Sequence, residues 1–534
     1  MKKRLSTQKF GPGFTVDLDD PGYALPESVI VEKDVPIKMR DGLELASNIY
    51  RPNKPGRFPV IMSFTIYGKD LSGWGKGYRI PSHIISKSTA FEAVDPGFWV
   101  PYDYVVILVD SRGFGRSPGG AWKGYDYYDA IEWAGVQNWS NGKVGLCGVS
   151  YLAIIQWDAA YLRPPHLKAI IPWEADTLQP TPKYGCIPET GFLKKLDALF
   201  LAPSHPAWGR SFPDERPSGE HVLEPPLERV LEDINVPALI CATWSDQELH
   251  TRGGLWAYKT IASNHKWLYT HGRHKWREFY TSEALDIQKK FFDCFLKGSD
   301  NRIMLTPRVR LEIRENIHKY LVRYEDDWPL PRTKYKKLYL NAENGILDFH
   351  QYSRARKVSY NSSNEKAIFD IRFDEDTELT GHMKLKLWVS PEKANDMDIF
   401  VTLKKLDTEG NEVYFDSWHA PSRYPVALGW LRLSWRELDA ERSTPWQPLL
   451  KCESAHKVKV GDIVPCQIEI YPSSTLFRTG ESLRLVISGQ YGVESTRYVF
   501  DEASVNEGNH IIYTGGKYDS YLLVPIIQSE EIVT

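Results

Sequence analysis

No run of apolar residues in this 534-residue sequence approaches the roughly 20 residues that a membrane-spanning helix needs. The chain begins Met-Lys-Lys-Arg, as many signal peptides do, but the apolar stretch that should follow is missing. Internal repeats and low-complexity tracts are also missing. We therefore expect a cytoplasmic protein that does not insert into a membrane.

The sequence also lacks paired cysteines and an excess of charge of one sign. Its six cysteines are scattered, and none forms a C-x-x-C pair, which argues against a zinc site and against a disulfide framework. Lys and Arg number 66 and Asp and Glu number 69, so the net charge is only −3. Nucleic acids and anionic membranes bind basic stripes, which this sequence does not provide. We expect a small-molecule partner and no metal.

The first half of the chain has the pattern of an α/β domain with a largely parallel sheet. Short β-branched or apolar runs alternate with helical patterns from about residue 58 to residue 300, which indicates βαβ units. The predicted strands are 58–65, 104–110, 144–149, 167–172, 237–243 and 266–270. The predicted helices are 126–137, 151–162 and 282–296.

Two changes of pattern divide the rest of the chain. Prolines interrupt short helical pieces between residues 174 and 234, which indicates an inserted helical cap. From residue 304 to residue 534 the apolar residues alternate with polar ones, as in 308–313, 383–388, 399–403 and 483–487. This pattern predicts an all-β sandwich or jelly roll. The α/β core then comprises residues 28–173 and 235–303, after an N-terminal extension of residues 1–27.

Ser150 is the candidate nucleophile. It stands in Gly148-Val-Ser150-Tyr151-Leu152, between a predicted strand and a predicted helix. A nucleophile elbow holds its serine on such a turn, with the hydroxyl above the sheet and the next N–H aimed at the oxyanion. Leu152 occupies the place of the second glycine in G-x-S-x-G, so this segment alone leaves an ordinary turn serine as an alternative.

Partners for this serine follow in the expected order. In an α/β-hydrolase the acid and then the histidine come from loops after later strands, at the carboxyl edge of the sheet. Asp246 ends one predicted strand, and both His271 and His274 follow the next. The acid would orient the imidazole and the histidine would take the serine proton. Spacing alone slightly favours His274.

Four segments in the same order resemble the family of cocaine esterase and X-prolyl dipeptidyl peptidase, which also contains α-amino acid ester hydrolases. In chain order they are 110–118 (Asp-Ser-Arg-Gly-Phe-Gly-Arg-Ser-Pro), 148–152, 291–298 (Phe-Phe-Asp-Cys-Phe-Leu-Lys-Gly) and 429–438 (Gly-Trp-Leu-Arg-Leu-Ser-Trp-Arg-Glu-Leu). The resemblance covers nearly the whole chain. It implies an α/β-hydrolase core, a helical cap inserted after the sixth strand and a C-terminal jelly roll.

The resemblance also implies roles for individual residues. In many relatives the one shared histidine of this loop falls on His271, which favours His271 over His274 as the triad base. A tyrosine after an early strand supplies an oxyanion donor in the family, and Tyr67 aligns with it, although Ile66 replaces the usual proline. The second donor is the Tyr151 N–H. Lower-ranked candidates are Glu174 and Asp176, which relatives place on the substrate side.

These residues predict a serine esterase or amidase that cleaves small acyl substrates through an acyl-enzyme on Ser150. No metal or organic cofactor is required. X-Pro dipeptidyl-peptidase and α-amino acid ester hydrolase activities are alternatives, and a non-catalytic binding protein is a distant one. A homo-oligomer is compatible with the sequence.

Overall fold

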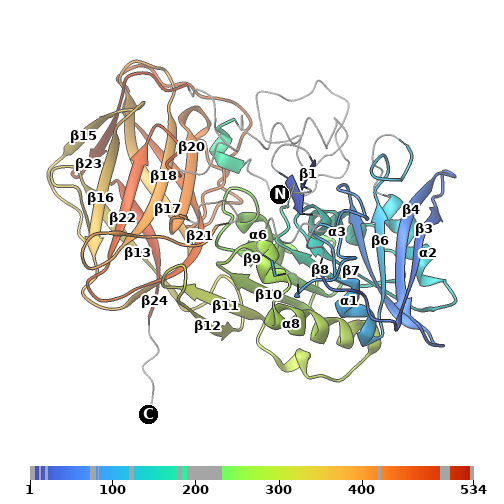
Figure 1. The fold of residues 1–534 in the computed structure, drawn as a ribbon. Coiled ribbons are helices and arrows are strands. Elements are labelled where there is room, and N and C mark those ends of the chain that lie inside the picture. Colours follow the sequence, from blue (N-terminus) through green and yellow to red (C-terminus); the bar gives the residue numbers. More distant parts are fainter. Residues whose placement is uncertain are drawn as a thin grey trace, which may run out of the picture.

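The structure is a computed structural model that describes residues 7–10, 14–17, 22–72, 80–81, 83–119, 125–177, 183–188, 231–417, 423–493 and 505–528. Its described part contains two large regions that lie side by side, an α/β region and an all-β region (Figure 1). The strands β1 (Thr7–Phe10) and β2 (Phe14–Asp17) form a small antiparallel pair of their own within the expected N-terminal extension.

The α/β region is built on one mostly parallel sheet. Its strand order is β3-β4-β6-β5-β7-β8-β9-β10-β11-β12, and the pairs from β6 through β11 are parallel. The bounds are β3 (Val29–Lys38), β4 (Glu44–Pro52), β5 (Phe58–Thr65), β6 (Val105–Asp110), β7 (Ser140–Val149), β8 (Leu167–Trp173), β9 (Ala238–Thr243), β10 (Lys266–His271), β11 (Val309–Arg314) and β12 (Tyr320–Glu325). The central strands β5, β6 and β9 are buried along their whole length, as expected for a sheet covered on both faces.

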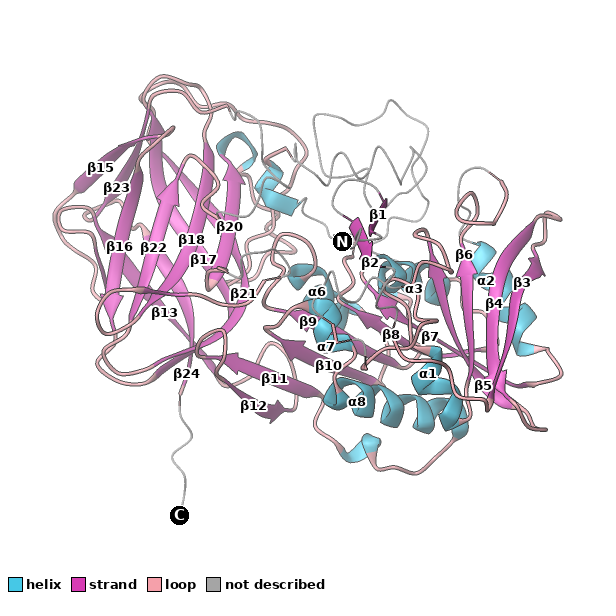
Figure 2. Ribbon diagram, viewed as in Figure 1, coloured by secondary structure: helices cyan, strands magenta, loops and turns pink. Residues whose placement is uncertain are grey.

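Helices cover both faces of this sheet (Figure 2). They are α1 (Pro96–Trp99), α2 (Tyr125–Gly135), α3 (Tyr151–Tyr161), α6 (Thr251–Thr260), α7 (Lys275–Phe279) and α8 (Ser282–Phe292). The Thr281 side chain caps α8 by accepting a hydrogen bond from the Ala284 N–H. The helix α3 is buried on nearly all sides, since it runs from the centre of the sheet.

The predicted elements are close to the observed ones, with one informative difference. The alternating run 308–313, which we assigned to the β domain, is β11, and it pairs in parallel with β10. The parallel sheet therefore continues for one strand beyond the expected boundary at residue 303 and ends in the antiparallel strand β12. Periodicity alone does not tell which sheet a strand joins.

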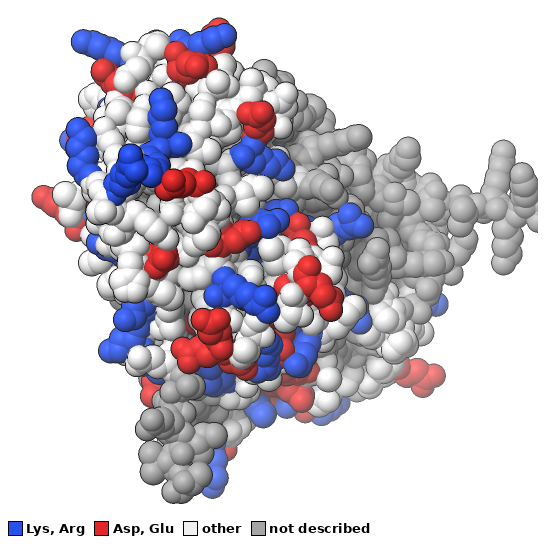
Figure 3. Space-filling view, turned by 90° about the vertical axis from the view of Figure 1, so that its left-hand side faces the viewer, with Lys and Arg blue, Asp and Glu red and all other residues white. Residues whose placement is uncertain are grey.

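The C-terminal region is all-β, with two layers of mainly antiparallel strands around a second core (Figures 1 and 2). Its longest strands, β17 and β21, pair along most of their length. The bounds are β13 (Thr333–Asn341), β14 (Ile346–Asp348), β15 (Arg356–Asn361), β16 (Lys366–Arg372), β17 (Thr377–Pro391), β18 (Asp398–Leu406), β19 (Glu412–Val413), β20 (Ala427–Arg432), β21 (Val464–Phe477), β22 (Ser482–Ser488), β23 (Asn509–Thr514) and β24 (Tyr521–Ile527). Figure 3 shows basic and acidic side chains mixed on the outer face of this region.

Most of the expected cap, residues 174–234, lies outside the described residues. Within it, the short helix η3 (Lys183–Cys186) packs on β20, and a Cβ added to Gly185 would lie 2.0 Å from the Trp430 carbonyl oxygen. All six cysteines are free thiols. Of the helices in the described residues, none has the length and apolar character to span a membrane.

Candidate active site

Ser150 occupies a strained turn between β7 and α3. Its backbone has φ 57° and ψ −115°, a conformation that residues other than glycine rarely adopt. The Ser150 N–H donates to the Trp173 carbonyl at the end of β8, 3.0 Å away, which ties the turn to the neighbouring strand. The residue is only 8% exposed. This is the strand, sharp turn and helix geometry of a nucleophile elbow.

The departure from G-x-S-x-G has a structural explanation. A Cβ added to Gly148 would lie 2.6 Å from the Cβ of Leu152, closer than two such atoms approach. The first glycine of the motif is therefore required by the leucine that replaces the second. β7 and α3 therefore approach each other closely although the motif has only one of its two glycines.

His250 is the hydrogen-bond partner of Ser150, the candidate nucleophile. Its Nε2 lies 3.0 Å from the Ser150 hydroxyl, and both side chains are buried. Asp246 Oδ2 lies 3.8 Å from the same nitrogen, so the predicted acid is beside this histidine. Lys275 Nζ lies 3.6 Å from Asp246 Oδ2 and adds a buried cation to the group. The loop between β9 and α6 supplies both Asp246 and His250.

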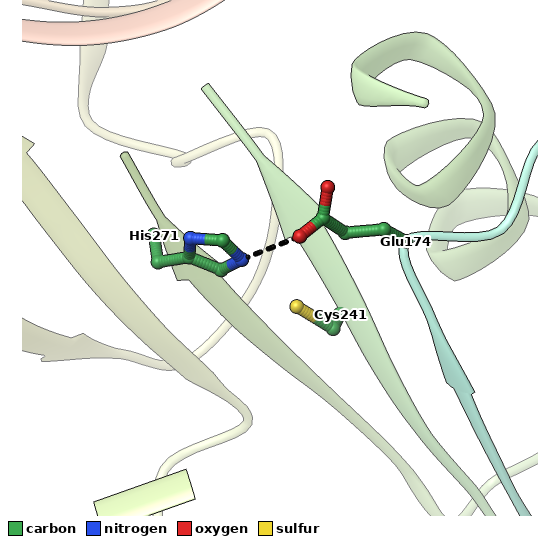
Figure 4. A group of neighbouring side chains, drawn as sticks. All are labelled: Glu174, Cys241 and His271. Carbon is green, nitrogen blue, oxygen red and sulfur yellow. Dashed lines mark hydrogen bonds and ion pairs between the residues drawn. The ribbon is translucent and has the colours of Figure 1, made fainter. Parts of the chain in front are cut away.

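The expectation that His271 is the base needs correction. Its Nε2 lies 2.9 Å from Glu174 Oε1 (Figure 4). Its ring stacks on Trp173, with ring centroids 6.2 Å apart. Its Nδ1 accepts the Arg273 N–H at 3.2 Å, so the ring proton of the neutral form lies on Nε2 and is donated to Glu174. Neither nitrogen is left to accept the Ser150 proton.

The other histidine alternative is not bonded to Ser150 either. His274 begins α7, and its backbone N–H donates to Asp416 Oδ2 in the β domain at 3.1 Å. Its ring packs against Trp276, with ring centroids 5.1 Å apart. In the described part of the chain, the hydroxyl of Ser150 is hydrogen-bonded to His250 rather than to either predicted histidine.

Glu174 and Asp176 follow β8. Glu174 is fully buried, with φ 51°, and its carboxyl group is bonded to His271 rather than directed to a substrate. Asp176 lies against α6, where a Cβ added to Gly253 would be 2.7 Å from Asp176 Oδ1. Its charge also acts on Arg252, whose pKa it helps to raise against burial.

Glu174, Cys241 and His271 form a buried group at the ends of β8, β9 and β10 (Figure 4). Each offers one metal-ligand atom, and these atoms lie within 4.8 Å of one another. Burial raises the pKa of the Glu174 carboxyl and the Cys241 thiol well above their usual values, and lowers the pKa of His271 to about 3. A cation would need the carboxylate and thiolate that this environment disfavours. The group fits a neutral hydrogen-bonded pair better than a metal site.

The two predicted oxyanion donors are Tyr151, which follows Ser150, and Tyr67, whose ring lies against Tyr151. Tyr151 is the first residue of α3, where a backbone N–H has no acceptor inside the helix. The Tyr67 ring lies edge to face with Tyr151, with centroids 6.4 Å apart, and is half-buried. The Tyr151 position is compatible with the predicted role, whereas the Tyr67 hydroxyl is hydrogen-bonded to the Glu92 carboxyl and would have to leave it to donate to an oxyanion.

Glu92 is a buried carboxyl group of this neighbourhood that the sequence analysis did not identify. Its Oε1 accepts the Trp276 Nε1–H at 2.9 Å, and its carbonyl accepts the Val149 N–H of β7. Burial raises the pKa of Glu92 to about 7, while Lys275 and hydrogen bonds from Trp276 and Tyr67 oppose the rise. Glu92 would therefore change its charge near neutral pH, within electrostatic reach of Lys275 and Asp246.

Comparison with known proteins follows the division into two regions. A family model described as X-Pro dipeptidyl-peptidase (S15 family) matches residues 41–210. A second, described as the X-Pro dipeptidyl-peptidase C-terminal non-catalytic domain, matches residues 301–523. A crystal structure of a CocE/NonD family hydrolase from Staphylococcus aureus is 42% identical, with a TM-score of 0.85 and 94% of each chain covered. The chain belongs to the CocE/NonD family of hydrolases.

More distant members of the comparison agree with this CocE/NonD assignment. A cocaine esterase from Rhodococcus sp. (strain MB1 Bresler) is 25% identical over 627 aligned positions, which cover 93% of this chain and 99% of the esterase. The structure of an α-amino acid ester hydrolase, 17% identical, has a TM-score of 0.67 over 97% of this chain and all of that one, and shows the shared fold. The predicted fold class and the prediction of a serine hydrolase are confirmed.

Proposed function

We propose that this CocE/NonD hydrolase cleaves ester or amide bonds of small acyl substrates through an acyl-enzyme on Ser150, with His250 as general base. The observation that carries the proposal is the 3.0 Å contact between Ser150 Oγ and His250 Nε2 at a strained strand-to-helix turn. A nucleophile and a base within hydrogen-bond reach, on an elbow that presents the hydroxyl, are the requirements for acyl transfer.

In the acylation step, Ser150 Oγ attacks the substrate carbonyl carbon as its proton passes to His250 Nε2. The carbonyl oxygen then becomes an oxyanion, which the Tyr151 N–H and the Tyr67 hydroxyl would stabilise. The Asp246 carboxylate, 3.8 Å from His250 Nε2, would stabilise the imidazolium cation. His250 gives its proton to the leaving alcohol or amine as the tetrahedral intermediate collapses.

Deacylation repeats these steps with water as the nucleophile. His250 takes a proton from the water as it attacks the acyl carbon, and then returns the proton to Ser150 Oγ. No step uses a group from outside the chain other than substrate and water. We propose a small-molecule substrate, because Lys and Arg nearly balance Asp and Glu and no basic stripe is present. The cytoplasmic location stays a proposal.

Ester hydrolysis is the preferred activity and X-Pro dipeptide release the alternative. The first is supported by the resemblance to a cocaine esterase over 93% of the chain, and the second by the X-Pro dipeptidyl-peptidase model over residues 41–210. Purified enzyme assayed with p-nitrophenyl butyrate and with an X-Pro p-nitroanilide distinguishes the two.

Covalent labelling tests the nucleophile itself. We expect a fluorophosphonate probe to label the wild-type protein once per active site, at a peptide that contains Ser150, and to leave folded Ser150→Ala unlabelled. A p-nitrophenyl ester should give a burst of p-nitrophenol that the same substitution abolishes. Labelling that persists in Ser150→Ala, or folded wild-type protein with neither burst nor label, would disprove the proposal.

A further inference from the structure

The loop that joins β9 to α6 carries Asp246 and His250, and the C-terminal β domain holds it from several sides. The Trp244 carbonyl, at the start of this loop, accepts a hydrogen bond from Arg314 Nη1 at 3.2 Å. The same guanidinium donates to the Val426 carbonyl at 3.0 Å and to Ser473 Oγ at 2.8 Å in the β domain. Arg314 is among the largest fully buried side chains of the described residues. A buried cation thus links the loop to the β domain.

Gln247 makes the next set of contacts. Its backbone N–H donates to the Tyr424 hydroxyl at 3.0 Å, and its side-chain oxygen accepts the Leu428 N–H at 2.6 Å. Its amide nitrogen faces the carbonyl oxygens of Val426 and Pro472 at 3.3 and 3.5 Å. Gln247 is 1% exposed, and its side chain is bonded to backbone groups of β20 and of the residue before this strand. These bonds fix the residue next to Asp246.

Glu248 completes the attachment. Its Oε1 accepts the Tyr491 hydroxyl at 2.6 Å, and its Oε2 accepts the Tyr424 hydroxyl. Its backbone carbonyl accepts the Tyr184 hydroxyl of the η3 segment at 2.6 Å. Burial raises the pKa of Glu248 to about 7, and the two tyrosine donors of the carboxyl group oppose that rise. Three tyrosines from outside the α/β core therefore surround one residue of the loop.

These hydrogen bonds hold the loop between β9 and α6 in one position. A buried donor or acceptor that loses its partner costs about 1–3 kcal/mol, and more if it is charged. Moving the loop would separate Gln247 and Glu248 from all these partners together. His250 follows two residues later and shares the same turn, because its N–H donates to the Asp246 carbonyl at 2.9 Å.

We propose that the C-terminal β domain is part of the catalytic apparatus, because it sets the position of His250 through Gln247 and Glu248. Tyr424 and Tyr491 are then positioning residues of the active site, although neither touches Ser150. The inference rests on the proposed role of His250 as base. It assigns a role in positioning the proposed general base to a region that the family description calls non-catalytic.

The test is Tyr424→Phe, which removes one hydroxyl that serves both Glu248 and the Gln247 N–H and leaves the ring in place. We expect kcat for p-nitrophenyl butyrate to fall roughly 10–100-fold with KM changed less than about threefold, since displacement of a catalytic group lowers turnover rather than binding. Tyr491→Phe removes only the hydrogen bond to Glu248 Oε1, so it should lower kcat by a smaller factor. This second variant also decides the matter if Tyr424→Phe does not fold.

Tyr360→Phe is the matched control. Tyr360 is also buried in the β domain, and its hydroxyl lies 3.1 Å from His510 Nδ1, away from the loop. It should lose a similar amount of stability but keep the wild-type kcat. Wild-type kcat in Tyr424→Phe and Tyr491→Phe, or in Tyr491→Phe if Tyr424→Phe does not fold, while His250→Gln is inactive, would overturn this inference alone. Wild-type protein that fails to react with fluorophosphonate would instead disprove the proposed function on which the inference depends.

Discussion

At the scale of single residues, the general base must be a histidine with a ring nitrogen that can accept the Ser150 proton. His271 donates from Nε2 to Glu174 and accepts at Nδ1, and burial lowers its pKa to about 3. It is therefore a neutral, fully hydrogen-bonded residue at the carboxyl end of β10. His250 presents Nε2 to the Ser150 hydroxyl at 3.0 Å. The contacts of these two histidines therefore support the proposal that His250, rather than His271, is the general base.

Tyr67→Phe tests the oxyanion donor. We expect kcat to fall by roughly 10²–10³, the usual loss on removal of one such donor, with KM little changed. The measurement is the steady-state rate with a p-nitrophenyl ester. Tyr280→Phe is the control. It also removes one tyrosine hydroxyl, which is buried, donates to the Ala93 carbonyl at 2.6 Å and has no proposed role in catalysis. An unchanged kcat in Tyr67→Phe would exclude the hydroxyl from the oxyanion hole.

At the scale of elements, the elbow depends on the close approach of β7 and α3. Gly148→Ala would place a Cβ 2.6 Å from the Leu152 Cβ, so the turn must shift. We expect both a lower melting temperature and a kcat reduced at least about tenfold, because a displacement of the nucleophile is costly. Circular dichroism melting and ester turnover measure the two effects.

Gly145→Ala on the same strand provides the comparison. There the added Cβ would meet Phe292 Cε1 at 2.7 Å and Leu296 Cδ1 at 2.9 Å, both ends of side chains that can move. It should lower the melting temperature and leave kcat nearly unchanged. Equal losses of kcat in the two variants would contradict a specific role for the Gly148 contact.

The elements themselves were largely predictable from the sequence. The strand 58–65 coincides with β5, and 237–243 and 266–270 differ from β9 and β10 by one residue at one end. Buried parallel strands are short, continuous apolar runs, which sequence patterns mark clearly. The positions of Ser150 and Asp246 at the ends of β7 and β9 were predictable for the same reason, while their catalytic roles stay predictions.

His250 was not predictable from this reasoning. In this fold the histidine usually comes from the loop after the strand that follows the acid, which here is the loop after β10. In the structure, the loop after β9 instead brings Asp246 and His250 together. The path of a loop is set by its tertiary contacts, here those of Gln247 and Glu248 with the β domain, which no local pattern records. The one available signal was a histidine four residues after the predicted acid.

At the scale of the whole molecule, buried histidines predict how stability depends on pH. Burial lowers the pKa of His382 to about 3. Between pH 6.5 and 3 the unfolded chain binds a proton at this residue that the folded chain does not, so the contribution of His382 to stability falls as the pH is lowered through this range. The limiting slope is about 1.4 kcal/mol per pH unit for one group.

His382→Gln should reduce this slope. Urea unfolding at pH 6 and pH 4.5 gives the free energy of unfolding of wild type and variant under both conditions. We expect the difference between the two pH values to be smaller in the variant, even if its stability at pH 6 is lower. An equal difference in both proteins would show that His382 titrates normally in the folded state.

The pairing of Ser150 with His250 is tested most directly by comparing three histidine variants in one assay. We predict that kcat/KM for p-nitrophenyl butyrate falls by roughly 10²–10⁴ in His250→Gln, the usual contribution of a general base. Folded His271→Gln and His274→Gln should stay within about tenfold of wild type, since a general base is lost in neither. Wild-type turnover in His250→Gln, with a loss of that size in His271→Gln or His274→Gln, would contradict the account.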